Sequence, residues 1–119
     1  MLTCLGKYLR TFRIERGELL KDMAEKLSLA PAYLSSIENG KRVATKKLID
    51  NFIKIYQLSE NEVKDLMDAF HMSLNEVSFR MSDASNMQKS VGIAFARKFG
   101  NLNEEQIKSI KNILDEVDC

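Results

Sequence analysis

Apolar residues recur at every third or fourth position along most of this 119-residue chain. This spacing places them on one face of an α-helix, which each helix can bury against its neighbours. The chain also has one proline, Pro31, and five glycines. Strands are usually bounded by clusters of these two residues, so their scarcity favours helices. The sequence therefore predicts an all-α fold.

The first three expected helices are short and have clear boundary signals. The first ends before Gly17, and its apolar face leaves Arg13 on the outside. The second carries apolar residues over 20–27 at helical spacing. The third begins at Pro31, since proline suits a first turn, and ends at Asn39 and Gly40, a pair typical of left-handed caps.

Two more helices are expected before residue 72, which would complete a five-helix domain over residues 1–71. Thr45 is placed to cap the fourth helix. Ser59 is followed three residues later by Glu62, which is the pattern of a capping box at the start of the fifth helix.

The pattern changes in the second part, residues 72–119. Val77, Phe79 and Met81 alternate with polar residues, which predicts one short strand. Two helices are expected after it, one over about 85–99 and a last one capped by Asn103. A lone strand leaves its backbone groups unpaired, and no second strand is evident in the sequence.

This second part is therefore a candidate dimerisation or partner-binding region. Two copies of the strand can pair about a two-fold axis, which would bury its apolar residues. The last helix has a coiled-coil-like seam that can add to the contact. The alternative is that both surfaces pack within one monomer. The seam consists of Ile107, Ile110, Leu114 and Val117.

Charge is distributed unevenly, although the formal net charge is only +1. Residues 1–58 carry a net charge of +5, and residues 59–119 carry −4. This asymmetry indicates that the front part meets a polyanion. The chain lacks a signal-peptide pattern and an apolar run long enough to span a membrane, so we expect a cytoplasmic protein without membrane association.

The residues that commonly carry chemistry are sparse and scattered. Cys4, Cys119 and His71 do not form the ligand set of a zinc site. We expect Cys4 to be buried and Cys119 to lie at a frayed end. Phosphate-binding loops and clustered carboxylate pairs are also lacking. We therefore expect no metal, no cofactor and no enzymatic activity.

The most informative stretch is residues 20–39, where a three-residue turn at 28–30 joins two short helices. Ala24 is small enough for the second helix to cross close to it, and Leu34 and Ile37 face the first helix. A helix-turn-helix unit of this kind presents its second helix to the major groove of DNA. The outward side of that helix is formed by Ala32, Tyr33, Ser35, Ser36 and Asn39.

Residues 30–42, with the sequence APAYLSSIENGKR, resemble the recognition helix and exit turn of lambda-repressor-like (Cro/repressor, Xre-type) DNA-binding domains. The resemblance covers roughly residues 5–58. It implies that the chain binds double-stranded DNA, and it supplies candidate contacts. The candidates that face bases are Pro31, Ala32, Tyr33, Ser35, Ser36 and Asn39, with packing as the alternative for Tyr33. The candidates that contact phosphate are Lys41, Arg42, Lys46 and Lys47.

Three departures from the family pattern affect this interpretation. Leu20 stands where many members have a glutamine that contacts phosphate. Ser28 replaces the usual turn glycine, which requires a left-handed conformation at a cost of roughly 1 kcal/mol. Pro31 and Ala32 offer no bidentate hydrogen bonds to bases, so contacts there would be apolar.

Three functional hypotheses follow. The first is a transcriptional repressor that binds its operator as a homodimer and acts on its own gene or a mobile element. The second is an antitoxin whose acidic C-terminal region binds a basic toxin protein. The third is an adaptor that binds proteins and not DNA, because the fold alone does not establish function.

Overall fold

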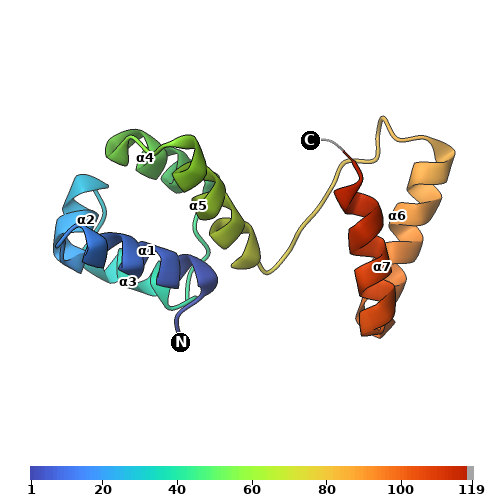
Figure 1. Ribbon diagram of the computed structural model, residues 1–119, viewed down its shortest axis with the longest axis horizontal. Coiled ribbons are helices and arrows are strands. Elements are labelled where there is room, and N and C mark those ends of the chain that lie inside the picture. The colour runs from blue at the N-terminus through green and yellow to red at the C-terminus, as the bar shows by residue number, and fades with distance from the viewer. Residues whose placement is uncertain (118–119) are drawn as a thin grey trace. The chain divides into compact units, whose positions relative to one another are not determined.

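The computed structural model describes residues 1–117, and this part of the chain is helical and contains no strand. It divides into two compact units, Met1–Val77 and Ser78–Cys119. The first unit contains α1 to α5 and the second contains α6 and α7, as labelled in Figure 1. The elements are α1 (Cys4–Glu15), α2 (Leu20–Lys26), α3 (Pro31–Glu38), α4 (Lys46–Tyr56), α5 (Glu60–Met72), α6 (Asn86–Lys98), the 3₁₀ turn η1 (Phe99–Asn101) and α7 (Glu104–Asp115).

The first unit encloses one hydrophobic core to which all five of its helices contribute. Phe12 lies among the aromatic residues of this core, with its ring centroid 5.1 Å from that of Phe52 and 4.9 Å from that of Tyr56. Removal of this apolar surface from water is the main force that holds the helices together. The core contains Leu5, Leu9, Phe12, Met23, Ala24, Leu27, Leu34, Ile37, Ala44, Leu48, Ile49, Phe52, Leu66 and Phe70.

The predicted helix boundaries are confirmed by hydrogen bonds. The Thr45 hydroxyl accepts from the backbone N–H of Leu48 at 3.1 Å. Ser59 and Glu62 form the expected capping box, since each side chain accepts from the backbone N–H of the other. Asn103 caps α7 by accepting from the N–H of Gln106. Each bond satisfies a backbone donor that the helix itself cannot pair.

The predicted strand over residues 77–81 is wrong. This segment is extended but has no strand partner in the described chain. Phe79 and Met81 instead lie against α6 at Gly92, where an added Cβ would sit 3.1 Å from Phe79 Cε2 and 3.3 Å from Met81 Sδ. Packing against a glycine on a neighbouring helix thus replaces the strand pairing that the alternation suggested.

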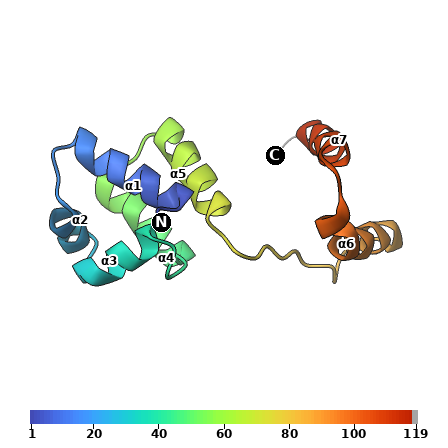
Figure 2. The ribbon, with the colours of Figure 1, turned by 90° about the horizontal axis from the view of Figure 1, so that it is seen from below.

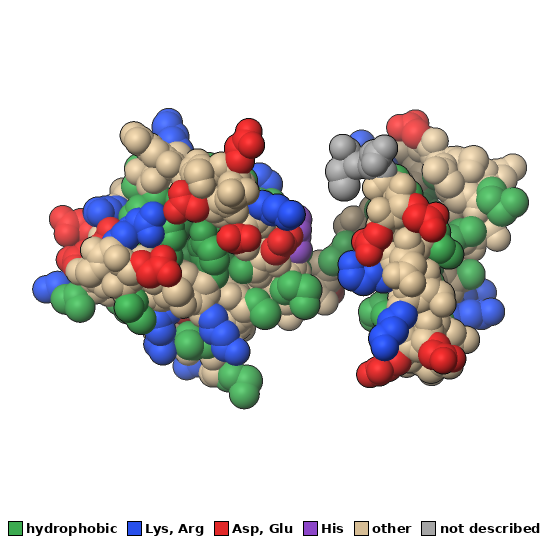
Figure 3. Space-filling model, in the orientation of Figure 1, with side chains coloured by type: hydrophobic (Ala, Val, Ile, Leu, Met, Phe, Trp, Pro, Cys, Tyr) green, Lys and Arg blue, Asp and Glu red, His purple; other side chains and the backbone are tan. Residues whose placement is uncertain are grey.

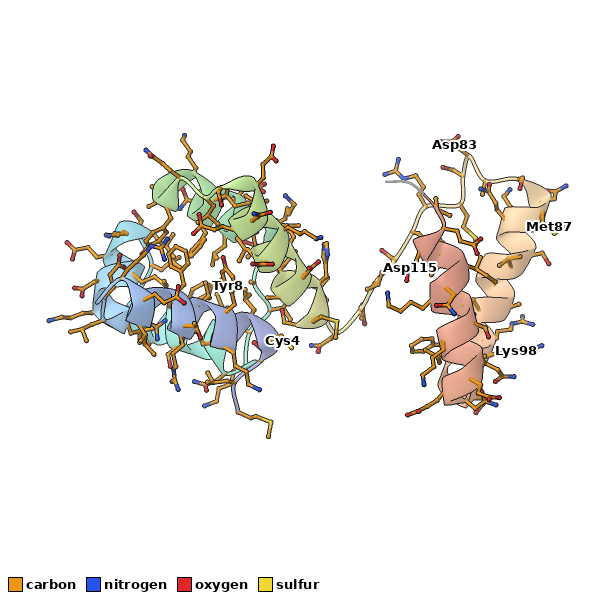
Figure 4. All side chains as sticks on the ribbon, viewed as in Figure 1. Cys4, Tyr8, Asp83, Met87, Lys98 and Asp115 are labelled. Carbon is orange, nitrogen blue, oxygen red and sulfur yellow. The ribbon has the colours of Figure 1, made fainter. Side chains whose placement is uncertain are left out.

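Two smaller expectations are also wrong. Cys4 is exposed at the start of α1, as Figure 4 shows, because it lies beside the buried face that begins at Leu5. Arg13, expected outside the apolar face of the first helix, is buried with 7% of its surface exposed. The expectation for Cys119 falls outside the described residues.

The second unit is built from α6, η1, α7 and the extended segment before α6. Figure 2 shows α6 and α7 joined through η1, with the two helices standing apart. No residue of 78–117 is buried. Within residues 1–117, no helix combines the length and the apolar character needed to cross a membrane.

Candidate nucleic-acid interface

The turn between α2 and α3 is tight and has the predicted geometry. Ser28 has φ of +57°, so it adopts the left-handed conformation that glycine usually provides. The N–H of Leu29 then donates to the carbonyl of Ala24 at 2.8 Å. Ala24 is fully buried, which agrees with its expected place at the helix crossing. The turn therefore fixes the direction in which α3 leaves α2.

Helix α3 is held by one face and open on the other. Leu34 and Ile37 are buried in the core, with 0% and 2% of their surfaces exposed. Pro31 and Ala32, in the first turn, are exposed. The half-buried residues farther along the outward face are Ser35, Ser36 and Asn39. Anchored in this way, the helix presents a continuous stripe of small and polar side chains.

Hydrogen bonds within α3 orient these polar groups. The Ser36 hydroxyl donates to the carbonyl of Ala32 at 2.9 Å. The Asn39 side-chain amide donates to the carbonyl of Ser35 at 3.0 Å. The Asn39 amide also donates to the Ser35 hydroxyl at 3.4 Å, while its amide oxygen remains suited to a further hydrogen bond. Asn39 is thus held in a defined orientation on the outward face.

Tyr33 lies at the border between this face and the core. Its ring is half buried and packs against the core cluster. The guanidinium carbon of Arg42 stands 5.5 Å from the ring centroid, within the range of a cation–π contact. The ring therefore positions Arg42, and it also lines an open hollow beside the turn together with Leu29 and Leu48.

The predicted phosphate contacts lie in the exit turn and at the start of α4, and all four are exposed. The N–H groups of Lys41 and Arg42 both donate to the Ser36 carbonyl, which ties the turn to α3. Lys46 forms an ion pair with Asp50 on the next turn of α4. In the described chain, Lys47 has no such partner. In Figure 3, Lys and Arg side chains gather along the edge of the first unit near α1 and α3.

A buried ion pair that the sequence reasoning missed fixes the far end of α3. Arg13 on α1 reaches both carboxylate oxygens of Glu38 through its two terminal nitrogens. Glu38 is only 2% exposed. A bidentate pair with this burial is rigid. Burial removes water from both charged groups, so each depends on the other for its hydrogen bonds. Nothing in the spacing of charged residues signals this pair, since Glu38 and Arg13 are 25 positions apart.

The backbone of α1 also approaches the end of α3 closely. The N–H of Thr3 donates to the carbonyl of Glu38 at 3.0 Å. An added Cβ at Gly6 would lie 2.1 Å from that same carbonyl oxygen, so the contact excludes any side chain. Because Gly6 has no side chain, the backbone of α1 can approach the end of α3 closely. This contact sets the position of α3 against α1.

A second polar cluster joins α2 to α4. The Glu18 carboxylate accepts from Lys26 Nζ at 2.7 Å and from the Tyr56 hydroxyl at 2.8 Å. Burial by itself would raise the pKa of Glu18, but these two hydrogen bonds lower it below the ordinary value. Burial, together with the Glu18 carboxylate, raises the pKa of Tyr56. The Glu18 carboxylate stays ionised at neutral pH. The cluster therefore connects α2, the helix that precedes α3, to α4.

On the other side of α1, Tyr8 reaches α5, as Figure 4 shows, and its hydroxyl donates to the Glu62 carbonyl at 3.2 Å.

The predicted dimer residues lie outside the candidate nucleic-acid interface. Val77 belongs to the first unit and is exposed. In the second unit Ile110 is half buried, whereas Ile107, Leu114 and Val117 are exposed. Over residues 1–117, no group of three or more His, Cys, Asp or Glu is placed to hold a metal ion.

Comparison with protein families gives one match. The model of a helix-turn-helix domain family matches residues 5–66, which is more than half of the chain. The chain belongs to this helix-turn-helix family. The match covers α2, α3 and the exit turn, and it is consistent with the resemblance to Cro/repressor-like domains. Comparison with curated proteins and with solved structures gave no match.

Proposed function

We propose that this helix-turn-helix protein is a sequence-specific regulator of transcription that binds double-stranded DNA as a homodimer and acts as a repressor. The observation that carries the proposal is the two-sided character of α3. One side is locked into the core by Leu34 and Ile37. The other is a stripe of small and polar side chains that is exposed in the first turn and half buried farther along. A helix held in this way enters the major groove, which is about 12 Å wide.

In this proposal the outward stripe of α3 contacts base edges. The Ala32 methyl group suits the methyl group of thymine, and Ser35 and Ser36 suit donors or acceptors on either base. Asn39 offers an amide that matches adenine. These contacts are short, so the backbone of α3 lies close to the bases.

Phosphate contacts position this helix in the groove. Lys41 and Arg42 leave the exit turn beside α3, and Lys47 stands at the first turn of α4. Arg42 is braced by the Tyr33 ring and reaches phosphate from a defined direction. Contacts of this kind add affinity without sequence preference and depend strongly on salt.

One copy of α3 covers too few base pairs to select a site in a genome, so the proposal includes a two-fold dimer. Two recognition helices then contact half-sites about 34 Å apart on one side of the duplex. Repression follows from occupancy of a promoter, and no chemical step is involved. The gene that encodes the protein is the first candidate target.

Selection of bound duplexes from a random pool tests this proposal without assuming an operator. The purified protein should enrich an inverted repeat whose half-site centres lie about 10 base pairs, or a multiple, apart. A variant with Asn39→Ala should alter the enriched bases at one position in each half-site. A pool that stays random after repeated rounds would refute sequence-specific binding.

Fluorescence anisotropy on the DNA upstream of the protein's own gene tests the regulatory target separately. Preference over a scrambled duplex by about a hundredfold or more supports autoregulation; this threshold lies below the range of about 10³–10⁷ that is typical of specific DNA-binding proteins. Equal binding to both duplexes would exclude its own promoter as the target.

A further inference from the structure

The second unit exposes an apolar surface that its own residues do not cover. Residues 78–117 include no buried residue, although α6 and α7 are well-capped helices. A folded segment of about 40 residues rarely holds together alone without a metal, disulfides or association. The large apolar side chains that remain exposed are Phe79, Met87, Val91, Ile93, Phe95, Phe99, Ile107, Ile113, Leu114 and Val117.

Many of these side chains face an open groove between α6 and α7, which we call the hairpin groove. Two adjoining hollows form it, and both are lined by Val91, Phe95, Ile110 and Leu114. One hollow has a volume of about 800 Å³ and continues to Met81 at the edge of the extended segment. Figure 3 shows hydrophobic side chains at the surface along the border of the two helices.

Side chains of both helices line the hairpin groove, and the groove is open to solvent. Helices that pack directly lie 8–10 Å apart and interlock their side chains. An open apolar groove of this kind is a common binding site for the apolar face of a further helix.

We propose that the hairpin groove is a dimerisation site, in which the α7 helix of a second copy of this chain lies between α6 and α7. By two-fold symmetry each copy inserts its α7 into the groove of the other, and the four helices form one bundle. The exposed residues of the α7 seam, Ile107, Leu114 and Val117, supply the inserted apolar face.

The apolar area agrees with a stable dimer. Six large side chains of the groove are exposed, and each offers on the order of 100 Å² to a partner. With the half-buried lining residues, the total approaches the roughly 800 Å² that each partner buries in a standard interface. These six side chains are Phe79, Met87, Val91, Phe95, Ile113 and Leu114.

Charge also favours a second copy over a basic partner protein. Residues 78–117 carry six Lys or Arg and five Asp or Glu, so this unit is nearly neutral. The acidic excess after residue 58 lies mainly on α5, in the first unit. Within the hairpin, α6 has three basic and no acidic residues, whereas α7 has three acidic and two basic residues. Helices α6 and α7 of two copies are therefore complementary.

This inference deepens the proposed function, since it names the surface that forms the homodimer, and it rests on that proposal only for the use of the dimer on DNA. The experiment that tests the dimer measures the molecular mass of the protein in the absence of DNA. A failure of DNA binding would leave the dimer intact, and a monomeric protein would still permit weak binding to a half-site. The two outcomes are thus distinguishable.

Sedimentation velocity of the full chain tests the dimer, with Val91→Asp and Ile93→Asp as a matched pair. Both residues are β-branched, exposed and on α6, but only Val91 lines the hairpin groove. We expect the wild type at twice the 13.6 kDa chain mass and Ile93→Asp unchanged. Val91→Asp should raise the dissociation constant at least about a hundredfold.

Three results would overturn the proposal. They are a wild-type monomer across the micromolar range, a dimer that persists in Val91→Asp, and equal dissociation of both variants. Because Val91→Asp can also unfold the hairpin, amide hydrogen exchange of the wild type supplies a test without a variant. Protection of α6 and α7 should rise with protein concentration, and protection independent of concentration would contradict the dimer. A wild-type monomer that a small basic protein binds through Val91 would favour a toxin partner instead.

Discussion

Arg13 on α1 forms an ion pair with Glu38, the last residue of α3. Helix α3 is the helix that we propose enters the major groove of DNA. The pair is bidentate, and Arg13 Nη2 lies 3.3 Å from Glu38 Oε1. Thr3 and Gly6 approach the same residue through its carbonyl oxygen. Helix α1 therefore controls the position of α3 at its C-terminal end, while the turn at Ser28 controls it at its N-terminal end.

Removal of one partner of this pair should strongly destabilise the first unit. Arg13→Met leaves the Glu38 carboxylate buried without a counter-charge, at a cost of about 3–5 kcal/mol in the free energy of unfolding. The double variant Arg13→Met with Glu38→Leu should recover at least half of that loss, because no charge remains buried. Urea unfolding measures both. If the double variant loses as much stability as Arg13→Met and Glu38→Leu lose in sum, the ion pair is not the cause of the destabilisation.

Gly6→Ala should destabilise the same junction through sterics alone. The added Cβ would meet the Glu38 carbonyl at 2.1 Å, so α1 and α3 must separate. We expect a loss of about 1–3 kcal/mol, as for other overpacked sites. Lys7→Ala, on the exposed side of α1, is the control and should change stability by less than about 0.5 kcal/mol. Equal stability of the two variants would show that the close approach is not rigid.

Ser28→Gly should stabilise the protein by up to about 1 kcal/mol, because the left-handed conformation strains any residue with a Cβ. Gln57 has φ of +49°, so Gln57→Gly is expected to act in the same direction. Ala30→Gly, at φ of −67°, should instead destabilise by adding backbone freedom to the unfolded chain. Thermal melts compare the three. A destabilised Ser28→Gly variant would indicate that the serine side chain is needed in the turn.

The Glu18 cluster predicts a loss of stability in acid. Since folding lowers the pKa of Glu18 below its ordinary value of 4.5, its contribution is present above that value. The contribution falls as the pH drops through the lower folded value. Glu18→Gln should make unfolding less dependent on pH below about 5. Glu25→Gln, an exposed change on α2, serves as the control, and identical acid profiles for the two variants would refute the assignment.

Phosphate contacts predict a change in the salt dependence of DNA binding. Lys47→Ala should weaken binding to all duplexes alike and reduce the slope of log K against log salt by about 0.9. Lys46→Ala should have a smaller effect, because Asp50 already partly neutralises that charge. Lys64→Ala, on α5, is the control. An unchanged slope for Lys47→Ala would remove this residue from the interface.

Helices of both units could be predicted because several carry their own local signals. Thr45, Ser59 and Asn103 mark helix starts through short-range hydrogen bonds, and these appear directly in the sequence. The left-handed conformation of Ser28 was expected from the family resemblance, because Ser28 stands where the family usually has a turn glycine. The burial of Arg13 could not be predicted in this way, since its partner is distant in the chain.

The predicted strand was wrong for a related reason. Alternation at Val77, Phe79 and Met81 describes an extended segment with one apolar side, but it does not specify what covers that side. In the structure Gly92 on α6 provides the contact for Phe79 and Met81. Extended segments need a partner that only tertiary structure reveals.

The central claim is that α3 reads duplex DNA, and a ratio of affinities tests it most directly. Fluorescence anisotropy would compare the duplex enriched by selection with a scrambled duplex of the same composition, at two salt concentrations. We expect a preference of at least about 10³ that persists when salt lowers both affinities. Equal affinity for the two duplexes, or no binding at low salt, would contradict it.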